Sequence, residues 1–236
     1  MEKPYLKEIE KLGKITVFEV DGNFVRDQIN KEFTNFGQHY IFKQIPEFEF
    51  WVDQEKSPGE IYYYIDHMLI EWQAMRAGKE KVEAIDRADK LEIRERKKSK
   101  IFKNSGIDKA ANQQEIIDKI HQKLLKEYSN DSLKVWLIDG ELVRDLYDLE
   151  FVEGGHDYVY QFIPVNEVWL DNDLAPGEYP FVLLHEIHER YLMATGKTYS
   201  QAHRSASSIE HQARLAPQTT AGWLKKEFEK NNKLGL

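Results

Sequence analysis

The sequence predicts an α+β protein built by tandem duplication of one unit, which holds a short β-sheet and ends in a helical hairpin. Residues 21–92 align without a gap onto residues 139–210, and 25 of the 72 aligned positions are identical. So much identity at one constant spacing of 118 residues indicates an internal repeat. Within each copy, short runs rich in β-branched and aromatic residues precede a stretch with helical periodicity. We expect the two units to associate about a pseudo-twofold axis.

The predicted units are residues 1–112 and residues 113–236. Between the aligned copies, residues 94–111 are rich in Lys, Ser and Asn. This composition is typical of a linker.

Each unit is expected to begin with an amphipathic helix followed by a strand. The strand is ITVFEV, residues 15–20, in the first unit and KVWLI, residues 134–138, in the second. The Asp-Gly pairs at residues 21–22 and 139–140 then predict tight turns.

Two more β-rich runs are expected in each unit, separated by an Ile-Pro bend. These runs are YIFKQI and EFWVD in the first unit, and DYVYQFI and EVWLD in the second. Trp51 and Trp169 are expected to be buried there with their indole N–H groups hydrogen-bonded. The periodicity after each Pro-Gly-Glu predicts a helical hairpin that turns at Gly78 or Gly196.

The composition narrows the classes of function. The formal net charge of −8 argues against a nucleic-acid partner, and the absence of cysteine excludes disulfides, thiol catalysis and Cys-ligated metals. Since no apolar run approaches the ~20 residues of a bilayer span and the N-terminus has no hydrophobic signal core, we expect a cytoplasmic protein without a membrane partner.

The run LLHEIHERYLM, residues 183–193, places two histidines and two glutamates among apolar residues. On a helix, His185 and Glu189 lie one turn apart on a face that also carries apolar side chains. Burying these polar groups without compensation would cost several kcal/mol. They should therefore be hydrogen-bonded to one another or bound to a cation.

The two units differ in part of this cluster. Three of its polar residues recur in the first unit and three are replaced by apolar ones. The recurring residues are His185, Glu189 and Glu210, which match His67, Glu71 and Glu92, and the replaced ones are Glu186, His188 and His203, which match Met68, Ile70 and Ile85.

The second unit is predicted to bind one divalent metal ion. His185 and Glu189 can reach the same ion from one helix, and the next helix adds His203 and Glu210. Three or four nitrogen and oxygen ligands from two packed helices suit zinc, and iron or manganese also accept such ligands.

HEIHE followed by a ligand-bearing helix resembles the active-site helix of the HExxH zinc peptidases, the zincins, in the variant form HExxE. The resemblance covers residues 185–210. It implies that His185 and Glu189 are ligands, that Glu186 is the general base, and that His203 or Glu210 is the third ligand. A metal-dependent hydrolase acting on proteins or peptides is the function it implies.

Two other functions fit the same residues. The cluster could be a His-Glu hydrogen-bond lock that fastens the helical hairpin, in a non-enzymatic metal-binding or protein-interaction module. This interpretation is favoured for the first unit, which lacks the base and the extra histidine. A metal enzyme of another type, such as an iron oxygenase, would use similar ligands.

The remaining motifs favour structural roles. GGHDY, residues 154–158, predicts a glycine-dependent turn, with His156 as a further ligand or a substrate contact in the alternative interpretation. The adjacent pairs Arg26-Asp27 and Arg144-Asp145 predict a structural ion pair or a turn lock.

Near the C-terminus, His211 and Arg214 are expected to be solvated. The amphipathic segment WLKKEFEKNNKLGL predicts a final helix that packs within the chain or forms a homodimer contact.

Overall fold

The computed structural model describes residues 4–56, 59–98 and 112–234. The chain divides into two compact units, residues 1–108 and residues 109–236. The boundary predicted from the sequence lies after residue 112. Most of the predicted linker, residues 99–111, lies outside the described residues, while its first residues complete a helix that runs to Arg96. The predicted α+β class is confirmed, because each unit combines a four-stranded sheet with helices.

The first unit ends in two long helices. Its elements are β1 (Tyr5–Leu12), β2 (Ile15–Val20), α1 (Gly22–Gln28), β3 (Phe36–Gln38), β4 (Glu49–Asp53), α2 (Ile61–Arg76) and α3 (Lys81–Arg96).

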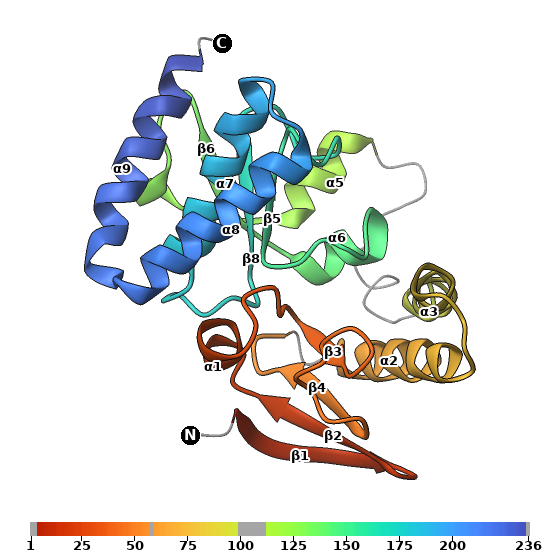
Figure 1. Cartoon of the computed structure of the whole chain (residues 1–236). Helices are drawn as coiled ribbons and strands as arrows, with labels where there is room; N and C mark the ends of the chain where they lie inside the picture. The colour runs from red at the N-terminus through yellow and green to blue at the C-terminus, as the bar shows by residue number, and fades with distance from the viewer. Residues whose placement is uncertain (1–3, 57–58, 99–111, 235–236) are drawn as a thin grey trace. The chain divides into compact units, whose positions relative to one another are not determined.

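The second unit has a third long helix, coloured dark blue in Figure 1. Its elements are α5 (Gln113–Ile120), β5 (His121–Leu124), η1 (Lys126–Tyr128), β6 (Lys134–Ile138), α6 (Gly140–Leu146), β7 (Gly154–His156), β8 (Glu167–Asp171), α7 (Tyr179–Ala194), α8 (Tyr199–Leu215), η2 (Pro217–Thr219), α9 (Thr220–Asn231) and η3 (Asn232–Leu234).

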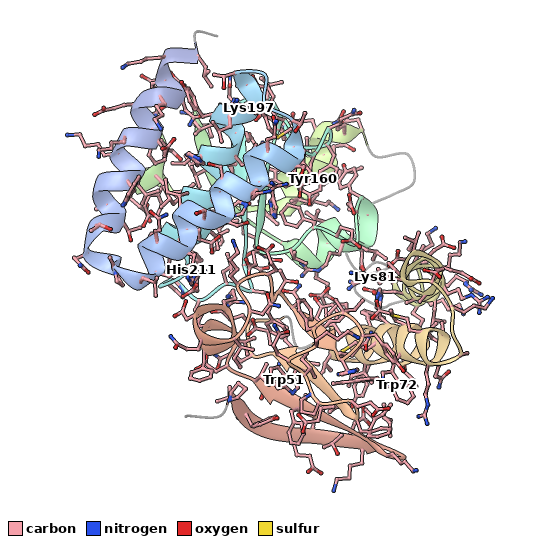
Figure 2. The ribbon with its side chains drawn as sticks, in the orientation of Figure 1. Trp51, Trp72, Lys81, Tyr160, Lys197 and His211 are labelled. Atoms are coloured by element: carbon pink, nitrogen blue, oxygen red, sulfur yellow. The ribbon has the colours of Figure 1, made fainter. Side chains whose placement is uncertain are left out.

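The two sheets have the same strand order. It is β1-β2-β4-β3 in the first unit and β5-β6-β8-β7 in the second. In each sheet the two central strands are parallel and the outer strands pair antiparallel to them. The predicted roles of the tryptophans are confirmed, because Trp51 and Trp169 are buried and donate their indole N–H to Glu49 and Glu167. Figure 2 labels Trp51 on the first sheet.

The helix predicted at the start of the first unit is wrong. Residues 5–12 form β1, which pairs antiparallel with β2. The spacing of apolar residues hardly separates a helix from a strand in so short a segment. Residues 5–12 are extended because β2 accepts and donates the backbone hydrogen bonds of β1. In the second unit the predicted helix exists as α5 but ends at Ile120, where β5 begins.

The Asp-Gly pairs begin helices and do not form tight turns. Asp21 and Asp139 are N-cap residues whose carboxylates accept hydrogen bonds from the backbone N–H groups of Phe24 and Leu142, at 3.0 and 2.9 Å. Glycine follows each cap because a Cβ on Gly22 would overlap the carboxylate of a buried aspartate.

Each of the two arginines pairs with an aspartate far along the chain. Arg26 pairs with Asp53 at 2.7 Å and Arg144 with Asp171 at 2.5 Å. Side chains at adjacent positions of a helix point in different directions, so each arginine reaches the end of a central strand, 27 residues further on.

Two of the predicted β-rich runs are not strands. YIFKQI and DYVYQFI form turns, whereas the segments before them form β3 and β7, the second of which includes the glycines of the predicted GGHDY turn. The glycines of β7 are required by close packing, because a Cβ on Gly155 would lie 2.7 Å from ring atoms of Tyr160.

The predicted helical hairpins are confirmed. Gly78 and Gly196 adopt positive φ angles of 83° and 93° in the turns that follow α2 and α7, and Figure 2 labels Lys197 in the second of these turns. Among the described residues, no helix is both long and apolar enough to cross a membrane.

Candidate metal centre

Helix α7 lies at the centre of the second unit. It contacts β7, β8, α8 and α9, of which Figure 1 labels β8, α8 and α9. Contacts on several sides bury residues 182–184 and 186–190. The apolar members of this set fill the core of the unit, and the polar members meet groups from β7, α8 and α9.

Three of the predicted ligands converge on one point. His185 Nε2 lies 3.2 Å from His203 Nδ1, which lies 3.0 Å from Glu189 Oε1. The third edge, from His185 Nε2 to Glu189 Oε1, is 4.0 Å. Ligands of tetrahedral zinc at bond lengths of roughly 2.0–2.1 Å are about 3.3 Å apart. The three atoms therefore approximate one face of such a tetrahedron and could hold a metal ion.

The group is open on the side of α8. The His203 side chain is 38% exposed, whereas that of Glu189 is 4% exposed. The ring of Tyr199, itself half exposed, stacks on His203 with a centroid distance of 5.3 Å. A fourth position, for water or a substrate atom, would therefore lie on the exposed side of the group.

Glu210, the fourth predicted ligand, lies behind His185. Its carboxylate is 2.8 Å from His185 Nδ1, the nitrogen that faces away from Glu189. Arg214 bonds Glu210 at 2.9 Å and Glu178 at 2.5 Å. Arg214 was expected to be solvated and is instead buried between these two carboxylates, because its guanidinium compensates both.

The same chain of side chains exists in the first unit. His67 Nδ1 is 2.9 Å from Glu92, whose carboxylate also bonds Arg96 at 2.8 Å, and Arg96 lies 2.8 Å from Glu60. We call this four-residue chain, in either unit, the hairpin lock. Since the lock forms in a unit with Ile85 in place of His203, it does not depend on a metal group.

The hairpin lock fixes the orientation of His185. A histidine whose Nδ1 is held by a carboxylate presents Nε2 on the opposite side of the ring, as metal-binding histidines commonly do. In the second unit that nitrogen faces Glu189 and His203. In the first unit the His67 ring instead packs edge-on against Phe36, at 5.1 Å.

Glu186, the predicted base, is buried beside this group. It forms a second cluster of possible ligands with His156 and Glu189, whose donor atoms all lie within 4.8 Å of one another. Within the described part of the chain, no hydrogen bond to the Glu186 carboxylate is formed. The glycine of β7 at position 154 leaves the necessary space, because a Cβ there would lie 3.2 Å from Glu186 Cγ. Phe36 occupies the matching position in the first unit.

The electrostatics of the cluster favour a positive charge at His185. Burial alone would lower the pKa of His185, but the hydrogen bond to Glu210 and the charges of the neighbouring glutamates raise it to about 9. Burial raises the pKa of Glu186, although the positive charge of His185 opposes this. Burial would also raise the pKa of Glu189, but hydrogen bonds to two histidines lower it. A bound cation would satisfy the same carboxylates, and its binding would displace a proton from His185.

The first unit forms the hairpin lock with Ile85 in place of His203. Burial would lower the pKa of His67, but its hydrogen bond to Glu92 and the charges of Glu92, Glu71 and Asp89 raise it. Burial raises the pKa of Glu71.

His188 lies apart from the metal group. Its Nε2 is 2.9 Å from Ser205 Oγ, and its Nδ1 is 3.2 Å from Glu227 Oε1. These contacts tie α7 to α8 and α9. Ser205 lies inside α8, where the backbone N–H groups are used by the helix.

The predicted final helix exists as α9. It packs against α7, and Asn231 at its end donates to the backbone carbonyl of Ile187 at 2.9 Å. This is the intramolecular packing expected as one of two alternatives.

His156 lies in the segment that the sequence predicts as a turn, residues 154–158. It is fully buried on β7 and contacts Glu189. Burial lowers its pKa, which keeps the imidazole neutral. The matching residue in the first unit is Gln38, which contacts Glu71 in the same way. A comparison of these two positions in the sequence was the signal that could have indicated a shared contact with the glutamate.

Comparison of the chain with known protein families, with curated proteins and with solved structures finds no match.

Proposed function

We propose that the second unit binds one divalent metal ion through His185 Nε2, His203 Nδ1 and Glu189 Oε1. The observation that carries this proposal is the near-tetrahedral spacing of these three atoms, at 3.0, 3.2 and 4.0 Å. Two imidazoles and a carboxylate suit zinc best, with iron and manganese as alternatives. Glu210 supports His185 from behind and is not a ligand in this arrangement.

The function that fits this site is hydrolysis, most simply of a peptide bond. The ion would polarise the substrate carbonyl and activate a water molecule. Glu186 would take a proton from the attacking water and pass it to the leaving amine, since it is the buried carboxylate next to the ligands that has no hydrogen bond of its own among the described residues.

The departure from the HExxH pattern is compensated by the next helix. HEIHE supplies a glutamate where zincins have the second histidine, and His203 of α8 supplies the missing imidazole. The resulting set of two histidines and one glutamate is a composition that catalytic zinc sites use. This supports the zincin-like proposal while leaving the ligand order different.

The duplication gives the first unit a structural role in this proposal. The shared strand order and the shared hairpin lock support descent of both units from one ancestor. The first unit would keep the lock alone, and the pseudo-twofold association of the units stays a prediction.

A binding or structural module is the second candidate. The observation that favours it is the first unit itself, in which the lock forms with Met68 and Ile85 in place of Glu186 and His203. In that case the cluster of the second unit would serve stability or hold a structural ion.

Glu186→Gln separates the two candidates. The substitution keeps the shape of the side chain and removes the proton acceptor. We expect the variant to keep its metal and to lose at least about 100-fold in the rate of hydrolysis of a fluorogenic peptide library. Glu71→Gln is the matched control, because Glu71 is the first unit's counterpart of a proposed ligand, and it should change neither property. Equal hydrolysis by wild type and Glu186→Gln would exclude the proposed base.

A further inference from the structure

His156 presents a choice between two roles. It lies on β7 with no exposed surface, and its Nε2 is 3.2 Å from Glu189 Oε2. Because His156, Glu186 and Glu189 could together hold an ion, one role is that of ligand to a second metal that shares Glu189 with the first. The other role is to hold Glu189 by a hydrogen bond.

The backbone next to His156 decides which nitrogen carries the proton. The N–H of Tyr158 donates to His156 Nδ1 at 3.2 Å. Since Nδ1 accepts this bond, the neutral ring carries its proton on Nε2. That proton points at Glu189, and a protonated nitrogen has no lone pair for a metal.

The first unit makes the same two hydrogen bonds with a different residue. Gln38 Oε1 accepts from the N–H of Tyr40 at 2.7 Å, and Gln38 Nε2 donates to Glu71 Oε2 at 2.8 Å. The amide offers one acceptor and one donor in the order that the His156 tautomer requires. This pair of bonds is thus independent of any metal.

We infer that His156 is a positioning residue that donates its Nε2–H to Glu189 Oε2 and so directs Glu189 Oε1 toward the proposed metal. The inference rests on the proposed metal site. It assigns the two oxygens of Glu189 to different partners, His156 on one side and the group containing His203 on the other. It also assigns one ion, and not two, to the second unit.

Glutamine is the informative substitution at this position. His156→Gln should restore both hydrogen bonds, as Gln38 does, whereas His156→Ala removes them. Outer-shell partners of metal ligands commonly contribute 10- to 100-fold in affinity. We therefore expect His156→Ala to bind zinc about 10- to 100-fold more weakly than wild type, and His156→Gln to bind within about threefold of it.

The measurement is competition for zinc against a chromophoric chelator, with the stoichiometry determined in the same titration. One equivalent in wild type and in both variants, with rescue by glutamine, supports the inference. Two equivalents in wild type and one in His156→Gln would overturn it, because an amide does not replace an imidazole as a ligand. Equal affinity in all three proteins would also overturn it.

Nitrogen-15 NMR of the histidine rings tests the hydrogen bond without a metal. In metal-free wild type we expect His156 to show a protonated Nε2 and an unprotonated Nδ1, and the reverse tautomer would overturn the inference even if zinc binds. If wild type binds no zinc, the proposed function fails. The tautomer then still decides whether His156 holds Glu189.

Discussion

Removal of His203 should abolish stabilisation by zinc while leaving the fold intact. His203 is the proposed ligand contributed by α8, and it is the most exposed of the three. His203→Ala removes an imidazole that is 38% exposed and stacks on the half-exposed ring of Tyr199. Without metal, we expect the variant to lose no more than about 1 kcal/mol of stability.

The expected size of the zinc effect follows from linkage. Zinc at 100 times its dissociation constant stabilises a protein that binds it only when folded by about 2.7 kcal/mol. For the second unit, residues 109–236, a stabilisation of about 2.7 kcal/mol corresponds to a rise in melting temperature of roughly 10 °C. His203→Ala, with two ligands left, should rise by less than about 2 °C at the same zinc concentration.

The assay is thermal unfolding of chelator-stripped protein with and without zinc. His211→Ala is the matched control, because His211 lies on the same helix and belongs to neither group of possible ligands (Figure 2). It should keep the full rise. A rise in His203→Ala equal to that of wild type would refute the assignment of His203 as a ligand.

Two further predictions concern packing and pH. Gly155→Ala should destabilise the protein by about 1–3 kcal/mol in urea unfolding, because its Cβ would lie 2.7 Å from the Tyr160 ring. Gly177→Ala is the control, because its Cβ would meet nothing within 4 Å, and it should cost less than about 0.5 kcal/mol in the same assay. The raised pKa of His67 means that its contribution to stability is complete below its unfolded-state pKa of about 6.5 and is lost as the pH rises through the folded-state pKa. Wild type should thus lose stability above about pH 6.5 relative to His67→Gln, and parallel pH profiles would contradict the charged contact with Glu92.

Most of what could be predicted about the fold came from the internal repeat in the sequence. It located the hairpin helices, their glycine turns and the two buried tryptophans, since these depend on local patterns that occur twice. β1 could not be identified in this way, because its hydrogen bonds depend on a partner strand that local periodicity does not reveal. Likewise, Arg144 bonds Asp171, 27 residues away, and spacing in the sequence does not reveal so distant a partner.

The candidate site was predictable where the two units differ. The replacement of Glu186 and His203 by apolar residues in the first unit separated them from the shared residues, and the structure brings His203 to His185 and Glu189. Glu210 recurs in both units because it belongs to the hairpin lock, which sequence spacing alone did not distinguish from a ligand. For His156 the two preceding glycines favoured a turn over the alternative of a ligand, and the sequence did not indicate its contact with Glu189.

The most direct test of the central claim is the metal content of the untagged, purified protein, measured by elemental mass spectrometry beside a His185→Ala variant. We predict about one equivalent of zinc, iron or manganese per chain in wild type and its loss in the variant. A wild-type protein that holds none of these metals, even after reconstitution with each, would contradict the proposed metal centre and leave the His-Glu cluster as a structural lock.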